Sequence, residues 1–411
     1  MHVLMIGVGY FPQRTAGDKN FFVDLAASLR GRLRDLSIVS VNDGPTGEAV
    51  QDTPGGPISI WNVRRPLHFG NPERFFHRAG GTWSYHHLHR PWQEILERQL
   101  TLLDLGGRLK RRARDRGVDV VHFMDNFGLG MGWLRRKLDG PAVTATALRY
   151  DPRGLAYRLY LARSFGALDG VACLTDAYRD ILSGLGVDAA RLATLRWGPD
   201  PAFQVSAARA AAVAARYGLA PGAPLLVWAG FIQQVAEESL RETAALARVL
   251  TERVPDLHFA FALKPESWRD DFLAFAGERI HVERDLPDFP AFLARADCLV
   301  SPVVRPESTV APPLTWVEAM ALGTPVATTA ALGVEEAVID GETGVVASST
   351  VGLAEPLLAL LAARPRLAEL GRRAGALARA RFGLEAIVEG YTRFFARAAA
   401  RRQGVPQGGG G

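Results

Sequence analysis

Short apolar runs alternate with longer amphipathic segments through the first half of the chain. Residues 2–8 (HVLMIGV) form a nearly continuous apolar run, typical of a strand buried on both faces of a parallel sheet. Phe21, Leu25 and Leu29 then repeat at helical spacing. Asp18 precedes them as a candidate helix N-cap. Further strands are expected at 36–41, 118–124, 141–148, 170–175 and 192–198. This alternation predicts a doubly wound α/β domain.

The same alternation restarts with a strand at 221–230, directly after a Pro/Gly turn. We therefore predict two doubly wound domains, a final helix and a disordered tail, at 1–203, 204–380, 381–400 and 401–411. Parallel sheets bind ligands outside the carboxyl ends of their strands. Two such domains in series predict a ligand site in a cleft between them.

Composition and charge narrow the class of protein. With 48% hydrophobic and 22% charged residues, the 411-residue chain is typical of a globular protein. Cys173 and Cys298 lie in apolar runs and are predicted to be buried, reduced thiols, which suits a cytoplasmic protein. We expect no membrane-spanning helix, and residues 1–12 lack the basic start of a signal peptide.

Basic residues exceed acidic ones within 1–203, whereas acids slightly exceed bases in the remainder. The densest basic run, RLKRRARDR at 108–116, is interpreted as a solvated helix face. A basic first domain favours binding of an anionic substrate. Peripheral contact with a membrane surface is a second, less favoured interpretation of the same charge. Nucleic-acid binding is not expected, since no zinc, helix-turn-helix or RNP pattern is present.

The segment 301–344 carries the strongest chemical signal. Pro313 is placed in the first turn of a helix that contains LTWVEAMAL and stops at Gly323. The unpaired N–H groups at Leu314 and Thr315 would bind a diphosphate, because the helix dipole adds positive potential there. Glu318, one turn later, could accept hydrogen bonds from both hydroxyls of a ribose. A capping or ion-paired glutamate is the alternative reading.

This segment resembles the retaining glycosyltransferases of family 4, whose signature includes Glu-Ala-Met-Ala-x-Gly-Thr-Pro-Val. Residues 318–326 match it as EAMALGTPV. Weaker matches to family segments lie at 335–344, 167–182, 196–200 and 382–395, so the resemblance covers nearly the whole chain. It implies the GT-B fold, in which two Rossmann-like domains face each other across a cleft and a C-terminal helix returns to the first domain.

The resemblance implies retaining transfer of a sugar from a GDP- or UDP-linked donor, held by the second domain, to a small acceptor, held by the first. Candidate donor-binding residues are Gly17, Asp18, Gly230, Gln233, Gln234, Lys264, Leu314, Thr315 and Glu318. Candidate acceptor-binding residues are His122, Asp125, Arg149 and Arg153. Glu318, Lys264 and Arg305 are the candidate catalytic residues.

The chain departs from the family pattern at several donor-site positions. Val310 stands where the family has its first glutamate, and whether Glu307 replaces that residue is open. The family's diphosphate-binding Arg and Lys are replaced by Phe231 and Ala236. We therefore expect Lys264 or Arg305 to neutralise the diphosphate, with Gln233 and Gln234 as neutral donors. Without an Asp-x-Asp motif or a Cys/His cluster, we expect no metal cofactor.

Ala147 replaces the family's histidine near the acceptor. A thiol, which ionises far more easily than an alcohol, needs that base least. We therefore predict a thiol, thione or small anionic acceptor, in specialised-metabolite (antibiotic) biosynthesis. Three alternatives stay open: a cell-envelope lipid or polysaccharide glycosyltransferase, a sugar-nucleotide epimerase or phosphorylase on this fold, and a non-catalytic nucleotide-sugar-binding relative. The base, the sugar, the acceptor and the oligomeric state are left open.

Overall fold

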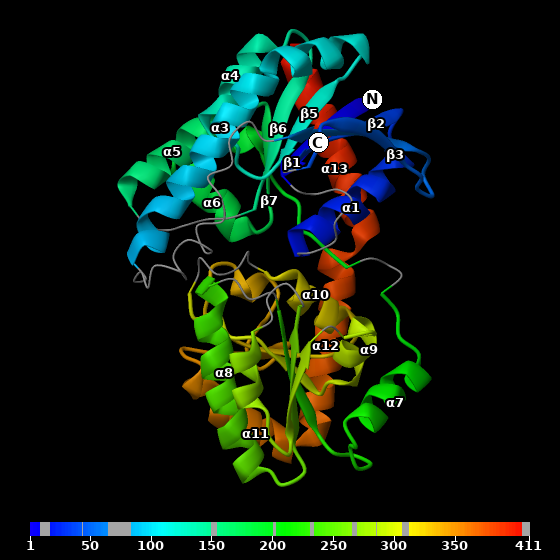
Figure 1. Ribbon diagram of the computed structural model, residues 1–411, viewed down its shortest axis with the longest axis vertical. Helices are drawn as coiled ribbons and strands as arrows, with labels where there is room; N and C mark the ends of the chain where they lie inside the picture. The colour runs from blue at the N-terminus through cyan, green and yellow to red at the C-terminus, as the bar shows by residue number, and fades with distance from the viewer. Residues whose placement is uncertain are drawn as a thin grey trace, which may run out of the picture.

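The computed structural model shows two α/β domains stacked along the long axis of the molecule (Figure 1). It describes residues 1–8, 17–42, 44–64, 84–148, 154–199, 203–230, 234–264, 269–284, 286–305 and 312–404. Two sheets of mainly parallel strands with helices on their faces confirm the predicted fold class.

The sheet of the first domain has the strand order β3-β4-β2-β1-β5-β6-β7-β8, and only the β3–β4 pairing is antiparallel. Its strands are β1 (His2–Val8), β2 (Asp35–Asn42), β3 (Gly47–Gln51), β4 (Ile58–Arg64), β5 (Val120–Met124), β6 (Ala142–Ala147), β7 (Gly170–Cys173) and β8 (Leu192–Thr194). The edge strand β3 and its neighbour β4 were not predicted. The strand expected at 192–198 ends at Thr194 instead, and the residues after it contact the second domain.

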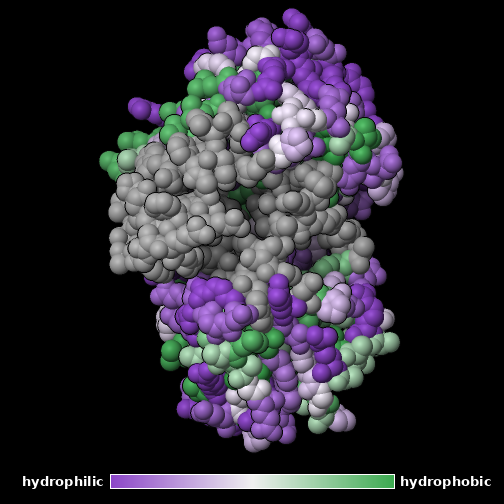
Figure 2. Space-filling view, viewed as in Figure 1, coloured by the Kyte–Doolittle hydropathy of each residue, from purple (hydrophilic) through white to green (hydrophobic). Residues whose placement is uncertain are grey.

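Two groups of helices cover the two faces of this sheet. The helices of the first domain are α1 (Gly17–Arg30), α3 (Ser84–Asp115), α4 (Leu129–Lys137), α5 (Leu155–Gly166) and α6 (Asp176–Gly184). Because α1 already begins at Gly17, Asp18 lies inside the helix and is not its N-cap. Leu155 and Leu159 of α5 are at least half exposed, and Figure 2 shows hydrophobic residues gathered on that side of the domain.

The second domain has a six-stranded, fully parallel sheet in the order β11-β10-β9-β12-β13-β14. Its strands are β9 (Leu225–Gly230), β10 (His258–Leu263), β11 (Ile280–Arg284), β12 (Cys298–Val300), β13 (Val326–Thr329) and β14 (Gly344–Ala347). Its helices are α7 (Ala207–Arg216), α8 (Gln234–Arg253), α9 (Phe289–Arg295), α10 (Leu314–Ala321), α11 (Ala354–Ala362) and α12 (Arg364–Phe382). Its short 3-10 turns are η3 (Asp270–Phe275), η5 (Val334–Glu336) and η6 (Val351–Leu353). The first domain has one such turn among its described residues, η1 (Ala189–Arg191).

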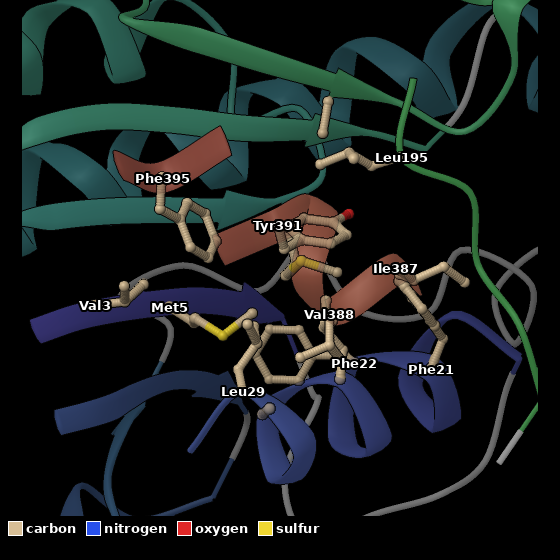
Figure 3. Close-up of a cluster of buried hydrophobic side chains, with 14 of the residues drawn as sticks. Val3, Met5, Phe21, Phe22, Leu29, Leu195, Ile387, Val388, Tyr391 and Phe395 are labelled. Carbon is tan, nitrogen blue, oxygen red and sulfur yellow. The ribbon is translucent and has the colours of Figure 1, made fainter. Parts of the chain in front are cut away.

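The last helix, α13 (Leu384–Arg402), returns to the first domain and packs beside α1 (Figure 1). Figure 3 shows Ile387, Val388 and Tyr391 of α13 facing Phe21 and Phe22 of α1. All five side chains are at least nine-tenths buried, so this helix is part of the first domain's core. The helix runs through Arg402, two residues beyond its predicted end.

A group of contacts joins the two domains beside α10. The indole Nε1 of Trp197 donates to the Pro312 carbonyl at 2.6 Å. The Arg196 guanidinium donates to the Glu336 carboxylate at 2.6 Å, and the same carboxylate accepts the Ala177 N–H at 2.9 Å. The carboxyl ends of strands from both sheets therefore meet the same interdomain boundary.

Candidate active site

The site begins with the first turn of α10, which lies at the boundary between the domains. The helix starts after Pro313, whose backbone is extended, and no described side chain caps it. Leu314 is buried in the same hydrophobic cluster as Phe21 of α1, so its side chain packs across the boundary. The N–H groups of Leu314 and Thr315 come before the helical hydrogen bonding and carry the positive end of the helix dipole. This turn fits an anionic group, as the sequence predicts.

Glu318 lies one turn further along α10 and is half-buried. Burial raises the pKa of its carboxyl to about 7. The positive charge of Lys264 lowers that pKa, whereas the negative charge of Asp24 raises it. Asp24 belongs to α1 of the first domain, so charged groups from both domains act on Glu318. The carboxyl therefore changes its ionisation near neutral pH.

Lys264 reaches this region because it directly follows β10. The last residue of that strand, Leu263, pairs with Gly230 at the end of β9. A β-carbon on Gly230 would lie 3.0 Å from the Trp228 ring, so a larger residue would crowd this strand end. Gly230 and Lys264 therefore lie together at the carboxyl ends of β9 and β10.

The other predicted donor-site residues are placed less fully. Gln234 is the first residue of α8 and Gly17 the first of α1, while the side chains of Gln234 and Asp18 lie outside the described residues. Gln233 lies outside them altogether, as do Phe231, Glu307 and Val310. Their predicted roles stay predictions.

Arg305 is paired within the second domain. Its guanidinium donates to the Glu238 carboxylate of α8. Its neighbour Val304 also contacts α8, since its N–H donates to the Ser239 hydroxyl at 3.3 Å. A diphosphate held by Arg305 would compete with Glu238 for the same positive charge, so Lys264 is the stronger of the two cationic candidates.

His122 does not serve the predicted acceptor site. The residue is fully buried in β5, where its Nδ1 lies 2.9 Å from the Thr144 hydroxyl and its Nε2 lies 3.0 Å from the Thr146 hydroxyl. The rings of Tyr391 and Phe395 from α13 pack against it, with centroids 5.8 and 5.0 Å away. Both ring nitrogens are satisfied by protein, and burial lowers the pKa to about 3. His122 is a neutral core residue, which corrects the prediction.

Asp125 stays a candidate for the acceptor side because it directly follows the central strand β5 and its backbone is strained. Its φ of 114° is rare for a residue other than glycine. Arg98 of α3 holds it by donating to its carboxylate at 2.8 Å and to the Asn126 carbonyl at 2.8 Å. Sequence reasoning missed Arg98, because its partner lies 27 residues away on another element. Arg149 and Arg153 lie outside the described residues.

Cys173 and Cys298 are free and buried, as predicted, and burial raises the pKa of the Cys173 thiol to about 12. In the described part of the chain, no three His, Cys, Asp or Glu residues are grouped so as to hold a metal ion. Among the helices of that part, none combines the length and apolar character that crossing a membrane requires.

Comparison with known proteins supports this reading of the two domains. Residues 223–363 match the family model described as Glycosyl transferases group 1. A sucrose-phosphate synthase from Thermosynechococcus elongatus superposes with a TM-score of 0.73 at 17% identity, covering 97% of this chain and 99% of that one. No curated protein sequence matches the chain.

Two further solved structures share the arrangement. The Anabaena protein HepE in complex with UDP has a TM-score of 0.67 at 14% identity, with 96% of this chain and 100% of that chain covered. WaaG, a glycosyltransferase involved in lipopolysaccharide biosynthesis, has a TM-score of 0.62 at 17% identity, covering 98% and 100%. The chain thus has the GT-B fold of glycosyltransferases.

The burial of His122 predicts a specific loss of stability in acid. In the unfolded chain this histidine takes up a proton near its ordinary pKa of 6.5, whereas in the folded protein it stays neutral down to about pH 3. Protons therefore favour the unfolded state between these values, and the free energy of unfolding falls as the pH drops below 6.5. At pH 5 this one group should lower it by about 2 kcal/mol.

Urea unfolding at pH 7.5 and 5.0 measures this effect in the wild type and in His122→Gln. Glutamine can still hydrogen-bond the two threonine hydroxyls but takes up no proton. The wild type should lose about 2 kcal/mol more than the variant between the two pH values. Equal losses in both proteins would show that folding does not lower the pKa of His122.

Proposed function

We propose that the protein transfers a sugar, with retention of anomeric configuration, from a nucleotide diphosphate sugar to a small acceptor at the boundary between its domains. The observation that carries this proposal is the uncapped first turn of α10, with Glu318 one turn behind it. The positive charge of Lys264, which directly follows β10, lowers the pKa of the Glu318 carboxyl. A helix N-terminus, a lysine and a carboxylate are the groups that a diphosphate and a ribose require.

In this proposal the donor binds mainly to the second domain. The N–H groups of Leu314 and Thr315 hold the diphosphate, and Lys264 neutralises part of its charge. The ionised Glu318 accepts hydrogen bonds from the ribose hydroxyls. The donor carries UDP or GDP; HepE, one of the structural neighbours, was solved with UDP and with UDP-glucose. These groups act without a metal ion in our proposal.

The transfer step needs no strong base from the protein. As the bond from the anomeric carbon to the diphosphate breaks, the acceptor attacks on the same face and its proton passes to the leaving phosphate oxygen. The protein then stabilises the charge that develops on the diphosphate and orients the acceptor. This accounts for the buried Ala147 at the end of β6, where a side-chain base is absent.

We place the acceptor on the first domain, near Asp125 and the Arg98 that holds it. A thiol or thione, or a small anion-bearing molecule, suits a site where Ala147 replaces the family's histidine and where an arginine lies at the edge. Such acceptors fit specialised-metabolite (antibiotic) biosynthesis. The two buried, free thiols support a reducing, cytoplasmic location.

Removing the carboxylate of Glu318 tests the donor site. Glu318→Ala should weaken binding of UDP or GDP by about 1.5–3 kcal/mol, the range for hydrogen bonds to a charged group. Isothermal titration calorimetry in the presence of EDTA measures this, and Glu335→Ala, an exposed glutamate of the same domain, is the matched control. Unchanged affinity in Glu318→Ala would remove it from the ribose role. Activity that is lost in EDTA and restored by Mg²⁺ or Mn²⁺ would contradict the metal-free proposal.

An acceptor screen with one accepted donor tests the other half of the reaction. Thiol, thione or anionic compounds should react faster than neutral alcohols of the same size, and Arg149→Ala should slow the anionic ones. The idea is wrong if neutral alcohols react well and Arg149→Ala leaves every rate unchanged. A new sugar nucleotide, or sugar released by phosphate, formed without any acceptor would instead indicate an epimerase or a phosphorylase.

A further inference from the structure

The first domain contains a cavity that takes no part in the proposed transfer. Its volume is about 320 Å³. The residues that line it are Trp61, Arg108, Arg111, Arg112, Asp115 and Arg116. Arg108, Arg111, Arg112 and Asp115 lie in the last turns of α3, and Arg116 directly follows the helix. All belong to the basic run that the sequence predicts to be a solvated helix face. Arg108 and Arg111 are exposed, as that prediction has it, and with Arg112 and Arg116 they line a solvent-open cavity whose wall includes Trp61.

The cavity lies away from the interdomain boundary. Helix α3 ends at Asp115, and β5 begins only five residues later, at Val120. The last turns of α3 therefore lie near the amino-terminal end of that strand, whereas α10 faces the carboxyl ends. Trp61 belongs to β4, where it pairs with Glu48 of the edge strand β3. A ligand in this cavity would be separate from the donor and the acceptor.

Two of the arginines are held in place over the tryptophan ring. The guanidinium carbons of Arg108 and Arg112 lie 5.7 and 5.0 Å from the Trp61 ring centroid. Arg108 also donates to the Asp104 carboxylate, and Arg112 donates to the Glu48 carboxylate at 2.7 Å. These contacts fix the positions of both guanidinium groups before any ligand arrives, which lowers the entropy cost of binding.

The other two arginines, Arg111 and Arg116, add positive charge, and the charge of Arg116 helps to lower the pKa of the Glu48 carboxyl. Arg111 and Arg116 form no ion pair with any residue that the structure describes. The one lining acid, Asp115, lies 3.5 Å from Arg114, which is outside the lining. The cavity is therefore lined by four arginines and a single acid.

We propose that this cavity binds a small, soluble polyanion bearing two or three phosphate groups. Guanidinium groups match phosphate oxygens in charge and in geometry, because two N–H groups can donate side by side. The volume is at the lower end of the range for small-molecule sites, about 300–1,000 Å³, and so fits a compact ligand. This site goes beyond the proposed glycosyl transfer and does not depend on it.

Inorganic tripolyphosphate is the probe, and the emission of Trp61 is the local readout. Tripolyphosphate could also enter the donor site, so the signal of interest is the fluorescence change that Trp61→Phe lacks. In the double variant Arg111→Ala/Arg116→Ala, the Kd from this signal should rise at least about tenfold. Glycosyl transfer should be unchanged in that variant, because neither arginine belongs to the transfer site.

A matched control removes the same charge from the same helix turns. Lys110 and Arg114 lie outside the lining and pair with Asp139 and Asp115. The double variant Lys110→Ala/Arg114→Ala should change the Kd by less than about threefold, since surface charges act weakly and are screened by salt. An equal loss of affinity in both double variants would show general charge attraction and overturn the proposal. So would an unchanged Kd in Arg111→Ala/Arg116→Ala.

Vesicles separate a soluble ligand from a lipid headgroup. Phosphatidylglycerol vesicles should not deplete the protein from solution, and tripolyphosphate should bind equally well in their presence. Vesicle binding that depends on Arg111 and Arg116, without binding of tripolyphosphate, would overturn the proposal of a soluble ligand. A fluorescence change that persists in full in Trp61→Phe would also overturn it, because the anion would then bind elsewhere.

Discussion

Helix α10 is held from the first domain at its very start, where the Trp197 indole donates to the Pro312 carbonyl and Leu314 packs in the cluster of Phe21. These contacts engage a carbonyl and a side chain, and they leave the first N–H groups of the helix without a side-chain cap. The same interaction that joins the domains therefore positions an anion-binding helix terminus at their boundary. The ion pair between Arg196, which directly precedes Trp197, and Glu336 also joins the two domains.

The ionised form of Glu318 is unfavourable at this position, because burial and the nearby negative charge of Asp24 both raise the pKa of its carboxyl. Lys264 offsets only part of that effect, since the pKa still rises to about 7. Folding alone gives no reason to place a carboxyl here, whereas a ligand with two adjacent hydroxyl donors would stabilise its charged form. Asp125, on the first domain, is likewise held in an unfavourable state. Its backbone has a conformation that residues other than glycine rarely adopt, and Arg98 holds its carboxylate there.

Much of the fold could be predicted from hydrophobic periodicity, because buried parallel strands such as 2–8 are nearly continuous apolar runs. The strands at 47–51 and 58–64 were not predicted. β3 is largely exposed, and β4 alternates buried with partly exposed positions, so neither forms the continuous apolar run by which the other strands were recognised. At the site, Lys264 and Glu318 could be placed by their positions after a strand and within a helix. His122 could not, because its partners on α13 are some 270 residues away and only the folded chain shows that helix covering β5. Asp24 and Arg98 were missed for the same reason: each acts through a residue on a distant element.

In the proposed donor site, Glu318 both accepts the ribose hydroxyls and ionises near neutral pH. The most direct test of this role is the affinity for a nucleotide sugar between pH 6 and 8, because the diphosphate diester of such a donor does not titrate in that range. With a pKa of about 7 the wild type should bind about tenfold more weakly at pH 6 than at pH 8, since only the ionised carboxyl accepts both hydroxyls. Glu318→Gln should bind with an affinity that does not change with pH. A wild-type affinity that is flat across this range, or one whose pH dependence survives in Glu318→Gln, would contradict the account.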